Sequence, residues 1–275
     1  MGYPANFKVT TRKLSDNVVI ASSAFTRADK FNFGARMALF NHDDSVIVWS
    51  ALPYGKEVEK SLELLTGSDQ KPNITHLIIP DREHTLAAKS FKEEYPNLKI
   101  IAMDSVKIPG VDIDYTFSEK DGNKLIDRKA LEEEIGIKEP AILDNFEFVY
   151  LPFHGNQELV TYEKSSKIVF EADLLFNLGV PGTTSGKVTL EQYSPELGFK
   201  KGFNPHSGWS FPTRYMQPNS KVGSFLFNKL VNPKKSKNGL QAIYNWDFNT
   251  IVMCHGNLID KDARATFKHV FSGAF

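Results

Sequence analysis

Cysteine is almost absent from this sequence, and its charges are evenly balanced. The one cysteine among the 275 residues, Cys254, excludes a disulfide within the chain and favours a reducing compartment. Lys and Arg together number 33, as do Asp and Glu, so no basic excess is available to neutralise phosphates. We therefore expect neither a disulfide-stabilised protein nor a nucleic-acid partner.

Long apolar segments, repeats and linkers are missing as well. No apolar run approaches the roughly 20 residues that a membrane-spanning helix needs, and the first residues, MGYPANFKVTTRKLSD, lack the apolar stretch of a secretory signal. We find no internal repeat and no low-complexity stretch. The sequence predicts one continuous domain over residues 1–275 with no membrane partner. A cytoplasmic location is expected, a nuclear one is equally compatible, and the oligomeric state stays open.

The chain is rich in phenylalanine, and its apolar residues follow a mixed strand and helix pattern. With 21 Phe residues, aromatic side chains should dominate the core. Short apolar segments predict strands over residues 17–22, 36–40, 45–50, 75–79, 98–102, 146–151, 158–162, 167–171 and 250–254. Helical spacing predicts helices over residues 56–65, 83–95, 127–134, 222–230, 240–244 and 261–271.

Three of the predicted strands end at a side chain that can bind a metal. His154 follows a strand in YLPFHG, Asp173 in KIVFEADLLFN and His255 in TIVMCHG. The residue just past a strand end points from a rigid platform into a cleft, which is a simple way to bring distant ligands together. The recurrence at three strand ends favours a metal site over three isolated buried side chains.

The order of these elements and motifs resembles the metallo-β-lactamase fold, a four-layer αβ/βα sandwich. The resemblance runs from about residue 17 to residue 271 and rests on LPFHG, KIVFEADLLF and VMCHG, with Cys254 in place of the first Gly of the family's GHG. It implies that His154 is a ligand of a first metal, Asp173 the bridging ligand and His255 a ligand of a second metal.

One motif departs from the family. Its HxHxDH signature should follow the strand THLII, where this chain reads PDREHTLAAKS. Only His84 remains as an obvious ligand there, with Asp81 and Glu83 as oxygen donors. The sequence is similar to a divergent branch in which a Pro-x-x-x-His pattern replaces that signature, and FGARMALFNHDDSVIVWSALP also resembles that branch.

We therefore expect one metal ion rather than two. It would be held by His84, His154, Asp173 and His255. Imidazole and carboxylate ligands suit zinc, and alternatively iron or manganese.

The remaining site predictions concern a catalytic base and a cover for the metal cleft. Asp173 would hold the metal or orient a water, and Glu83 is either a general base or a cap of the helix that we predict there. The long segment over residues 177–220 should fold over the cleft and bind the substrate. Its candidate substrate-binding residues are His206, Trp209, Phe211 and Tyr215. Alternatively, these rings fill the edge of the sandwich.

The function that this sequence predicts is metal-dependent hydrolysis of a small-molecule ester, lactone, thioester or amide by a metal-activated water. Two alternatives stay open. One is a binding protein that keeps the fold without the chemistry, which the loss of most of HxHxDH favours. The other is a single-iron oxidoreductase. The metal content of the protein would separate the three.

Overall fold

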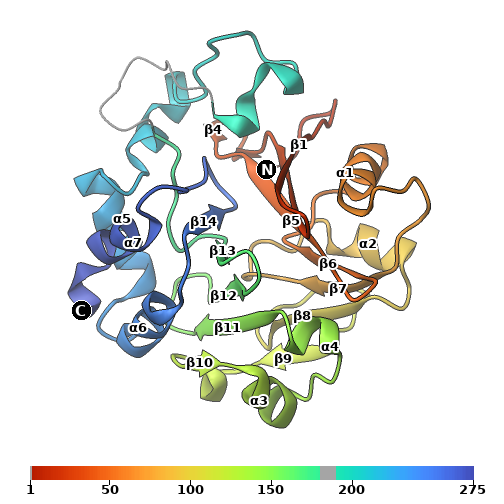
Figure 1. Ribbon diagram of the computed structural model, residues 1–275. Coiled ribbons are helices and arrows are strands. Elements are labelled where there is room, and N and C mark those ends of the chain that lie inside the picture. The colour runs from red at the N-terminus through yellow and green to blue at the C-terminus, as the bar shows by residue number, and fades with distance from the viewer. Residues whose placement is uncertain (1, 180–189) are drawn as a thin grey trace.

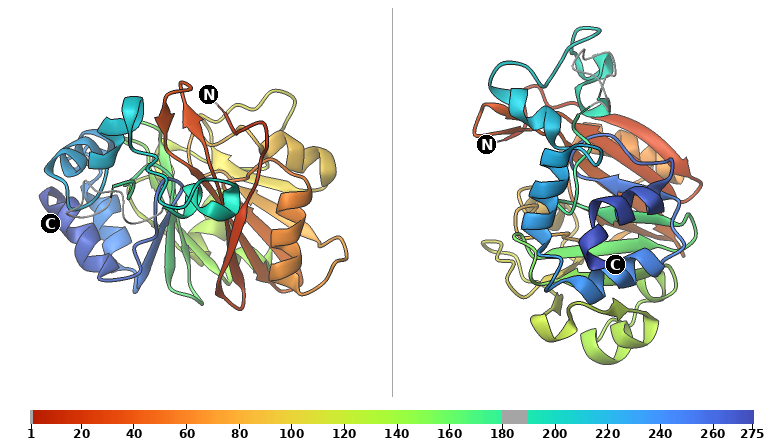
Figure 2. Two further views of the ribbon diagram at one scale, coloured as in Figure 1. Left: turned by 90° about the horizontal axis from the view of Figure 1, so that it is seen from above. Right: turned by 90° about the vertical axis from the view of Figure 1, so that its left-hand side faces the viewer.

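Two β-sheets lie face to face at the centre of the molecule, and helices cover the outer side of each sheet (Figures 1 and 2). The computed structural model describes residues 2–179 and 190–275. The two sheets and the helices outside them form four layers, which confirms the predicted αβ/βα arrangement. Part of the long segment predicted over residues 177–220 lies outside the described residues.

The first sheet has seven strands in the order β1-β2-β5-β6-β7-β8-β9. Neighbouring strands from β1 to β6 run antiparallel, whereas those from β6 to β9 run parallel. The strands are β1 (Thr10–Ser15), β2 (Val18–Ser23), β5 (Ala35–His42), β6 (Ser45–Trp49), β7 (Ile74–Ile78), β8 (Lys99–Met103) and β9 (Tyr115–Phe117). A small hairpin, β3 (Thr26–Arg27) and β4 (Phe31–Asn32), projects from this sheet.

The second sheet has five strands in the order of the chain. They are β10 (Leu125–Ile126), β11 (Phe146–Leu151), β12 (Glu158–Glu163), β13 (Ile168–Glu171) and β14 (Thr250–Met253). β13 and β14 run parallel, and the last residue of each, Glu171 and Met253, are partners in the ladder. The segments that follow β13 and β14 therefore leave the sheet at the same end of the two strands.

The helices divide between the two sheets. α1 (Lys56–Thr66) and α2 (Ala88–Glu94) lie outside the first sheet, and α5 (Lys221–Val231), α6 (Lys237–Asn245) and α7 (Ala263–Val270) lie outside the second (Figure 2). The shorter ones are η1 (Glu119–Asp121), α3 (Arg128–Ala130), the π-helix η2 (Leu131–Ile135), α4 (Pro140–Leu143), η3 (Glu191–Tyr193), η4 (Pro195–Leu197), η5 (Gly208–Tyr215) and η6 (Ser272–Ala274). Among the described residues, no helix has the length and apolar character to cross a bilayer.

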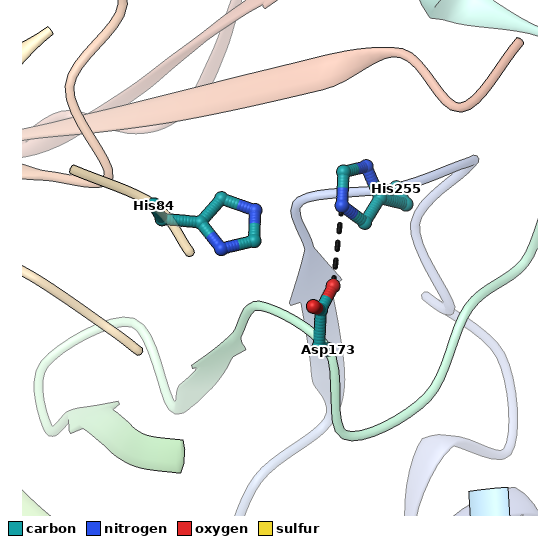
Figure 3. A group of neighbouring side chains, drawn as sticks. All are labelled: His84, Asp173 and His255. Carbon is teal, nitrogen blue, oxygen red and sulfur yellow. Dashed lines mark ion pairs between the residues drawn. The ribbon is translucent and has the colours of Figure 1, made fainter. Parts of the chain in front are cut away.

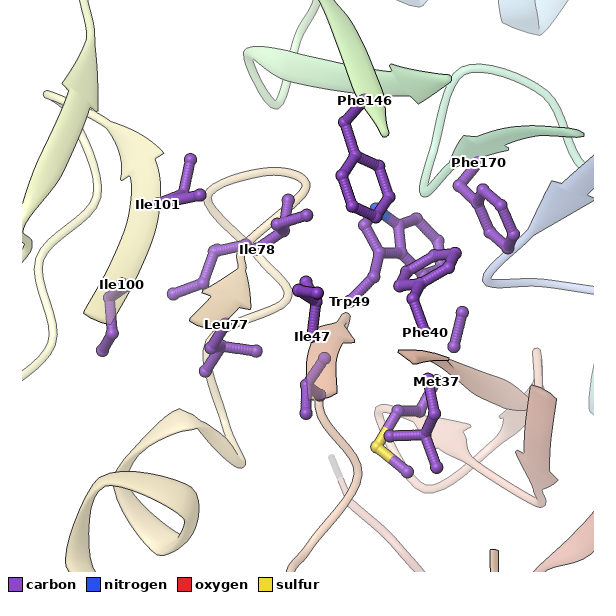
Figure 4. Packing of buried hydrophobic residues seen from close by; sticks show 14 of the residues in the cluster. Met37, Phe40, Ile47, Trp49, Leu77, Ile78, Ile100, Ile101, Phe146 and Phe170 are labelled. Carbon is purple, nitrogen blue, oxygen red and sulfur yellow. The ribbon is translucent and has the colours of Figure 1, made fainter. Parts of the chain in front are cut away.

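Aromatic rings join the two sheets, as the phenylalanine content predicts. The Phe40 ring of the first sheet lies 5.0 Å from that of Phe146 and 4.9 Å from that of Phe170, both in the second sheet. Trp49 packs at 5.6 Å from Phe170. Figure 4 shows these rings meeting between the sheets. Edge-to-face pairs of this kind fix the distance and orientation of the sheets.

Several elements differ from the sequence prediction, which does not contain the short strands β3, β4, β9 and β10. The helix expected over residues 83–95 begins only at Ala88, because the side chain of Asp81 accepts hydrogen bonds from the backbone N–H groups of Glu83 and His84 and stabilises a non-helical turn. The edge strand β1 was missed, since its sequence TTRKLS has no apolar run.

Candidate metal centre

Three side chains from distant parts of the chain meet at one edge of the sandwich. One ligand atom from each of His84, Asp173 and His255 lies within 4.8 Å of the other two. Figure 3 shows the three side chains directed toward one another. Nε2 of His255 lies 3.2 Å from Oδ1 of Asp173, and the ring centroids of His84 and His255 are 5.2 Å apart. Two imidazoles and a carboxylate are a ligand set that zinc accepts.

Strand pairing explains why Asp173 and His255 are neighbours. Each follows by two residues the strand end where β13 and β14 pair in parallel. Gly256 lets the segments after β13 and β14 stay close, because a Cβ at this position would lie 2.3 Å from the backbone of Asn177. The φ of Gly256, 99°, is also unfavourable for other residues. The close approach of these two chain segments therefore requires glycine at position 256.

Both histidines are oriented so that Nε2 can serve as a ligand atom. Nδ1 of His255 lies 2.8 Å from the carbonyl oxygen of Gly34, which can only accept, so Nδ1 carries the proton. Nδ1 of His84 lies 2.8 Å from Oδ1 of Asp81 and donates to that carboxylate. A hydrogen bond at Nδ1 that leaves Nε2 available is the usual support of a metal-binding histidine.

Two buried carboxyl groups hold the backbone around Asp173. Oε1 of Glu158 accepts from the N–H of Ala172 at 2.5 Å, and Oε2 accepts from the N–H of Asp173 at 3.1 Å. Oε2 of Glu171 accepts from the N–H groups of Leu174 and Leu175 at 2.9 and 3.2 Å. The turn that carries Asp173 is therefore fixed by side chains on β12 and β13.

The electrostatics of this region favour a bound cation. Asp81, Glu158, Glu171 and Asp173 are all buried. Burial, Asp81 and Glu171 raise the pKa of Glu158, and burial also raises that of Glu171. Oδ1 of Asp173 has no well-aligned hydrogen-bond partner among the described residues and faces Nε2 of His255. A divalent ion beside this oxygen would balance the buried charge of Asp173.

The pKa values of Asp173 and His84 are shifted in opposite directions, and His84 must give up its extra proton before Nε2 can bind an ion. Burial raises the pKa of Asp173, but the hydrogen bond with His255 and the charge of His84 outweigh it and hold the pKa below its ordinary value. Burial lowers the pKa of His84, but Asp81 and Cys254 more than offset this and raise it well above normal. Asp173 is thus ionised at neutral pH and available as a ligand.

Comparison with solved structures identifies the fold. The DIM-1 metallo-β-lactamase exposed to ceftazidime aligns over 100% of this chain and 98% of its own, with a TM-score of 0.57 and 13% identity. The chain has the metallo-β-lactamase fold. A metallo-β-lactamase from Erythrobacter litoralis aligns over 97% and 92%, with a TM-score of 0.55 and 11% identity.

A third similar structure is FIM-1 from Pseudomonas aeruginosa in the mono-zinc form. It aligns over 98% of this chain and 96% of its own, with a TM-score of 0.54 and 12% identity. No protein-family model and no curated protein sequence matches the chain. At these identities the likeness establishes the metallo-β-lactamase fold and not the activity.

Within this metallo-β-lactamase fold, the fourth predicted metal ligand lies beside Asp173 without joining the three-residue group. His154 is buried but is not a member of the group formed by His84, Asp173 and His255. Its Nδ1 accepts a long hydrogen bond of 3.3 Å from the N–H of Asn156, whose side-chain amide donates to Asp173 at 2.5 Å. Burial lowers the pKa of His154, so its imidazole is neutral at neutral pH, and Nε2 has no partner among the described residues.

The residues before His84 have different positions from those expected. Oδ1 of Asp81 is engaged by the His84 ring and two backbone N–H groups, so Asp81 orients a ligand instead of being one. Glu83 does not cap α2, which begins at Ala88. Glu83 instead lines the pocket beside His84 and forms an ion pair of 3.3 Å with Arg27.

The N-terminal part of the chain supplies one side of the metal pocket, at Tyr3, Phe25, Arg27 and Phe33. None of the four predicted substrate-binding residues, His206, Trp209, Phe211 and Tyr215, is among the described residues that line it. Nδ1 of His206 lies 2.6 Å from the hydroxyl of Thr213, and Trp209 is 72% exposed. These side chains lie elsewhere because η5 packs on the β3–β4 hairpin: the hydroxyl of Ser210, for example, accepts from the N–H of Asn32 at 2.8 Å.

The residues that line the pocket are mostly apolar, and several were not predicted. They are Tyr3, Phe25, Arg27, Phe33, Ala35, Arg36, Ser50, Ala51, Leu52, Glu83, His84, Leu86, Asp173, Phe176 and His255. Tyr3 packs edge-on against Phe25 at 5.2 Å, and burial raises the pKa of its phenol. No local sequence pattern connects residue 3 with a site built from residues 84 to 255.

Proposed function

We propose that the protein is a metal-dependent hydrolase that cleaves an ester, lactone, thioester or amide of a small molecule. The proposal is supported most directly by the grouping of His84, Asp173 and His255, with ligand atoms within 4.8 Å of one another. Zinc is the proposed ion, with iron or manganese as alternatives, because imidazole and carboxylate ligands suit all three. One ion per chain fits the three-residue group and the missing HxHxDH histidines.

The chemistry divides between the ion and the surrounding side chains. When bound, a divalent ion at this group would polarise a carbonyl and lower the pKa of a water molecule from about 15.7 toward about 7. Asp173 is a carboxylate at neutral pH, so its second oxygen can accept a hydrogen bond from a water and orient it. Asn156 already donates to that oxygen at 2.5 Å and fixes the carboxylate plane.

Tyr3 and Glu83 complete the proposed site. Because its pKa is raised, the Tyr3 phenol keeps its proton at neutral pH and can donate to the oxygen on which charge develops. Glu83 lines the same pocket and is the second carboxylate able to move a proton there. Its ion pair with Arg27 holds it at the pocket rim.

The test is turnover of a panel of aryl esters, lactones, thioesters and amides by zinc-loaded protein. We expect hydrolysis of at least one class, with kcat/KM reduced about 100-fold or more in His255→Ala. His269→Ala is the matched control, because His269 is an exposed histidine on α7. Hydrolysis that survives both His255→Ala and a chelator would contradict the proposal, as would the absence of turnover across the panel.

A further inference from the structure

A second depression adjoins the metal pocket on the surface of the molecule. It is formed by the β3–β4 hairpin on one side and by η5 and α5 on the other. We call it the apolar groove, and the residues that define it here are Phe31, Phe33, Phe211, Tyr215, Met216 and Val222. Phe211 is 47% exposed and Val222 is 51% exposed, which is unusual for a group of large apolar side chains.

The apolar groove lies next to the metal pocket. Phe33 and Arg27 line both depressions. The Phe33 ring lies 5.5 Å from the ring of His255 and 5.9 Å from that of Phe176, which also lines the metal pocket. A molecule whose reacting end lies beside His255 therefore meets Phe33 first and the groove next.

The groove has the chemistry of a hydrocarbon subsite. Arg27 is the one charged residue among its described lining residues, and its guanidinium is directed to Glu83 at 3.3 Å. Tyr215, Thr213 and Arg27 supply the few polar atoms. Such a surface offers little to a polar ligand but favours an alkyl chain, because each methylene that leaves water contributes to binding.

We propose that the apolar groove binds the alkyl chain of an amphipathic acyl substrate whose carbonyl lies at the His84, Asp173 and His255 group. The inference rests on the proposed function and narrows its substrate class to acyl compounds with a medium or long linear chain. Phe33 lines both depressions and lies 5.5 Å from the His255 ring, and this proximity of the groove to the metal group favours an acyl chain over a separate macromolecule.

The test uses zinc-loaded protein and a series of linear fatty acids from butanoate to dodecanoate, with affinity measured by calorimetry. Each fully buried methylene raises the affinity about fourfold. Because the groove is open on one side, each methylene should contribute about half of that free energy, which is roughly a twofold gain in affinity. Dodecanoate should then bind at least about 50-fold more tightly than butanoate.

Two variants on α5 test whether the chain-length dependence of the affinity arises in the groove. Val222→Glu introduces a charge into the groove, and the first turn of α5 tolerates an acidic residue. In this variant the ratio of dodecanoate to butanoate affinity should fall at least about tenfold. Phe225→Glu is the matched control, because Phe225 is 66% exposed on the same helix and does not line the groove. It should keep the wild-type ratio.

The outcomes separate this inference from the proposed function. A chain-length gain that Val222→Glu removes supports the groove even if no ester is hydrolysed. A flat series in a protein that does hydrolyse short esters overturns the inference and leaves the hydrolase intact. A flat series together with a dimer that Val222→Glu dissociates, or with vesicle binding that it abolishes, overturns the inference in favour of a second copy or a membrane.

Discussion

Glu158→Gln tests whether the hydrogen bonds between the Glu158 carboxyl group and the backbone at Asp173 support the metal site. In the native protein both oxygens of Glu158 accept backbone hydrogen bonds, from Ala172 at 2.5 Å and from Asp173 at 3.1 Å. Glutamine keeps the size of the side chain but has one accepting oxygen. Its amide nitrogen must therefore face one of these two N–H groups, whichever way the amide is turned.

The expected effect follows from the loss of one buried hydrogen bond and the new contact between two donors. A buried hydrogen bond contributes about 0.5–1.5 kcal/mol, and an unsatisfied buried donor costs about 1–3 kcal/mol. We expect Glu158→Gln to lower the free energy of unfolding by about 2–4 kcal/mol. Zinc affinity should fall about 10- to 100-fold, as when supporting partners of metal ligands are replaced.

Glu171→Gln is the matched control for this prediction. Both of its backbone hydrogen bonds go to one oxygen, Oε2, while Oε1 has no partner among the described residues. Glutamine can place its carbonyl oxygen at Oε2, so the free energy of unfolding should change by about 1 kcal/mol or less. Urea denaturation and a competition assay with a zinc chelator measure the two effects. Equal losses in both variants, or no loss in Glu158→Gln, would refute the reasoning.

Three further predictions concern stability, the exposed loop and the pocket. Burial raises the pKa of Glu139, but hydrogen bonds such as that from Lys99 lower it to about 2, against an ordinary value of 4.5. The stabilisation is therefore present above about pH 4.5 and is lost as the pH falls toward 2. Glu139→Gln should lower the free energy of unfolding by about 1–2 kcal/mol at pH 7, after allowance for solvent screening, and by little near pH 2. A loss of unfolding free energy that does not depend on pH would show that the ion pair with Lys99 contributes nothing. Trp209→Ala should change that free energy by about 0.5 kcal/mol or less and leave zinc affinity unaltered, because Trp209 is 72% exposed and contacts Lys30 at 5.2 Å; a clear drop in melting temperature would mean that the ring fills the edge of the sandwich. Tyr3→Phe should lower kcat/KM for any identified substrate about 10- to 100-fold with unchanged zinc content, and an unchanged kcat/KM would remove Tyr3 from the mechanism.

The layers of the fold could be predicted from the sequence because their signals are local. Apolar strands such as Phe146–Leu151 and the helical spacing of Lys56–Thr66 are readable in short windows, and the structure places both elements where the sequence predicts them. The polar edge strand Thr10–Ser15 has no such signal. The start of α2 was misplaced because one side chain, Asp81, competes with the helix for backbone N–H groups.

The candidate site was predictable only where its residues follow a local sequence signal. Asp173 and His255 follow two strands that pair in parallel, and a strand end is visible in sequence. The position of His154 relative to them depends on the turn after β11, which no periodicity defines. The contribution of Tyr3 and Phe33 to the pocket was not predicted because they reach the site through tertiary packing, whereas Phe211 and Tyr215 of η5 line the adjoining groove.

Zinc binding by chelator-treated protein tests the central claim most directly. Calorimetric titration should show about one tightly bound ion per chain, the number that three converging ligands can hold. His255→Ala should weaken this binding roughly 100-fold or more, while His269→Ala, on the surface of α7, should leave it unchanged. Failure of the native protein to take up zinc, iron or manganese, or equal zinc binding by His255→Ala and the native protein, would contradict the account.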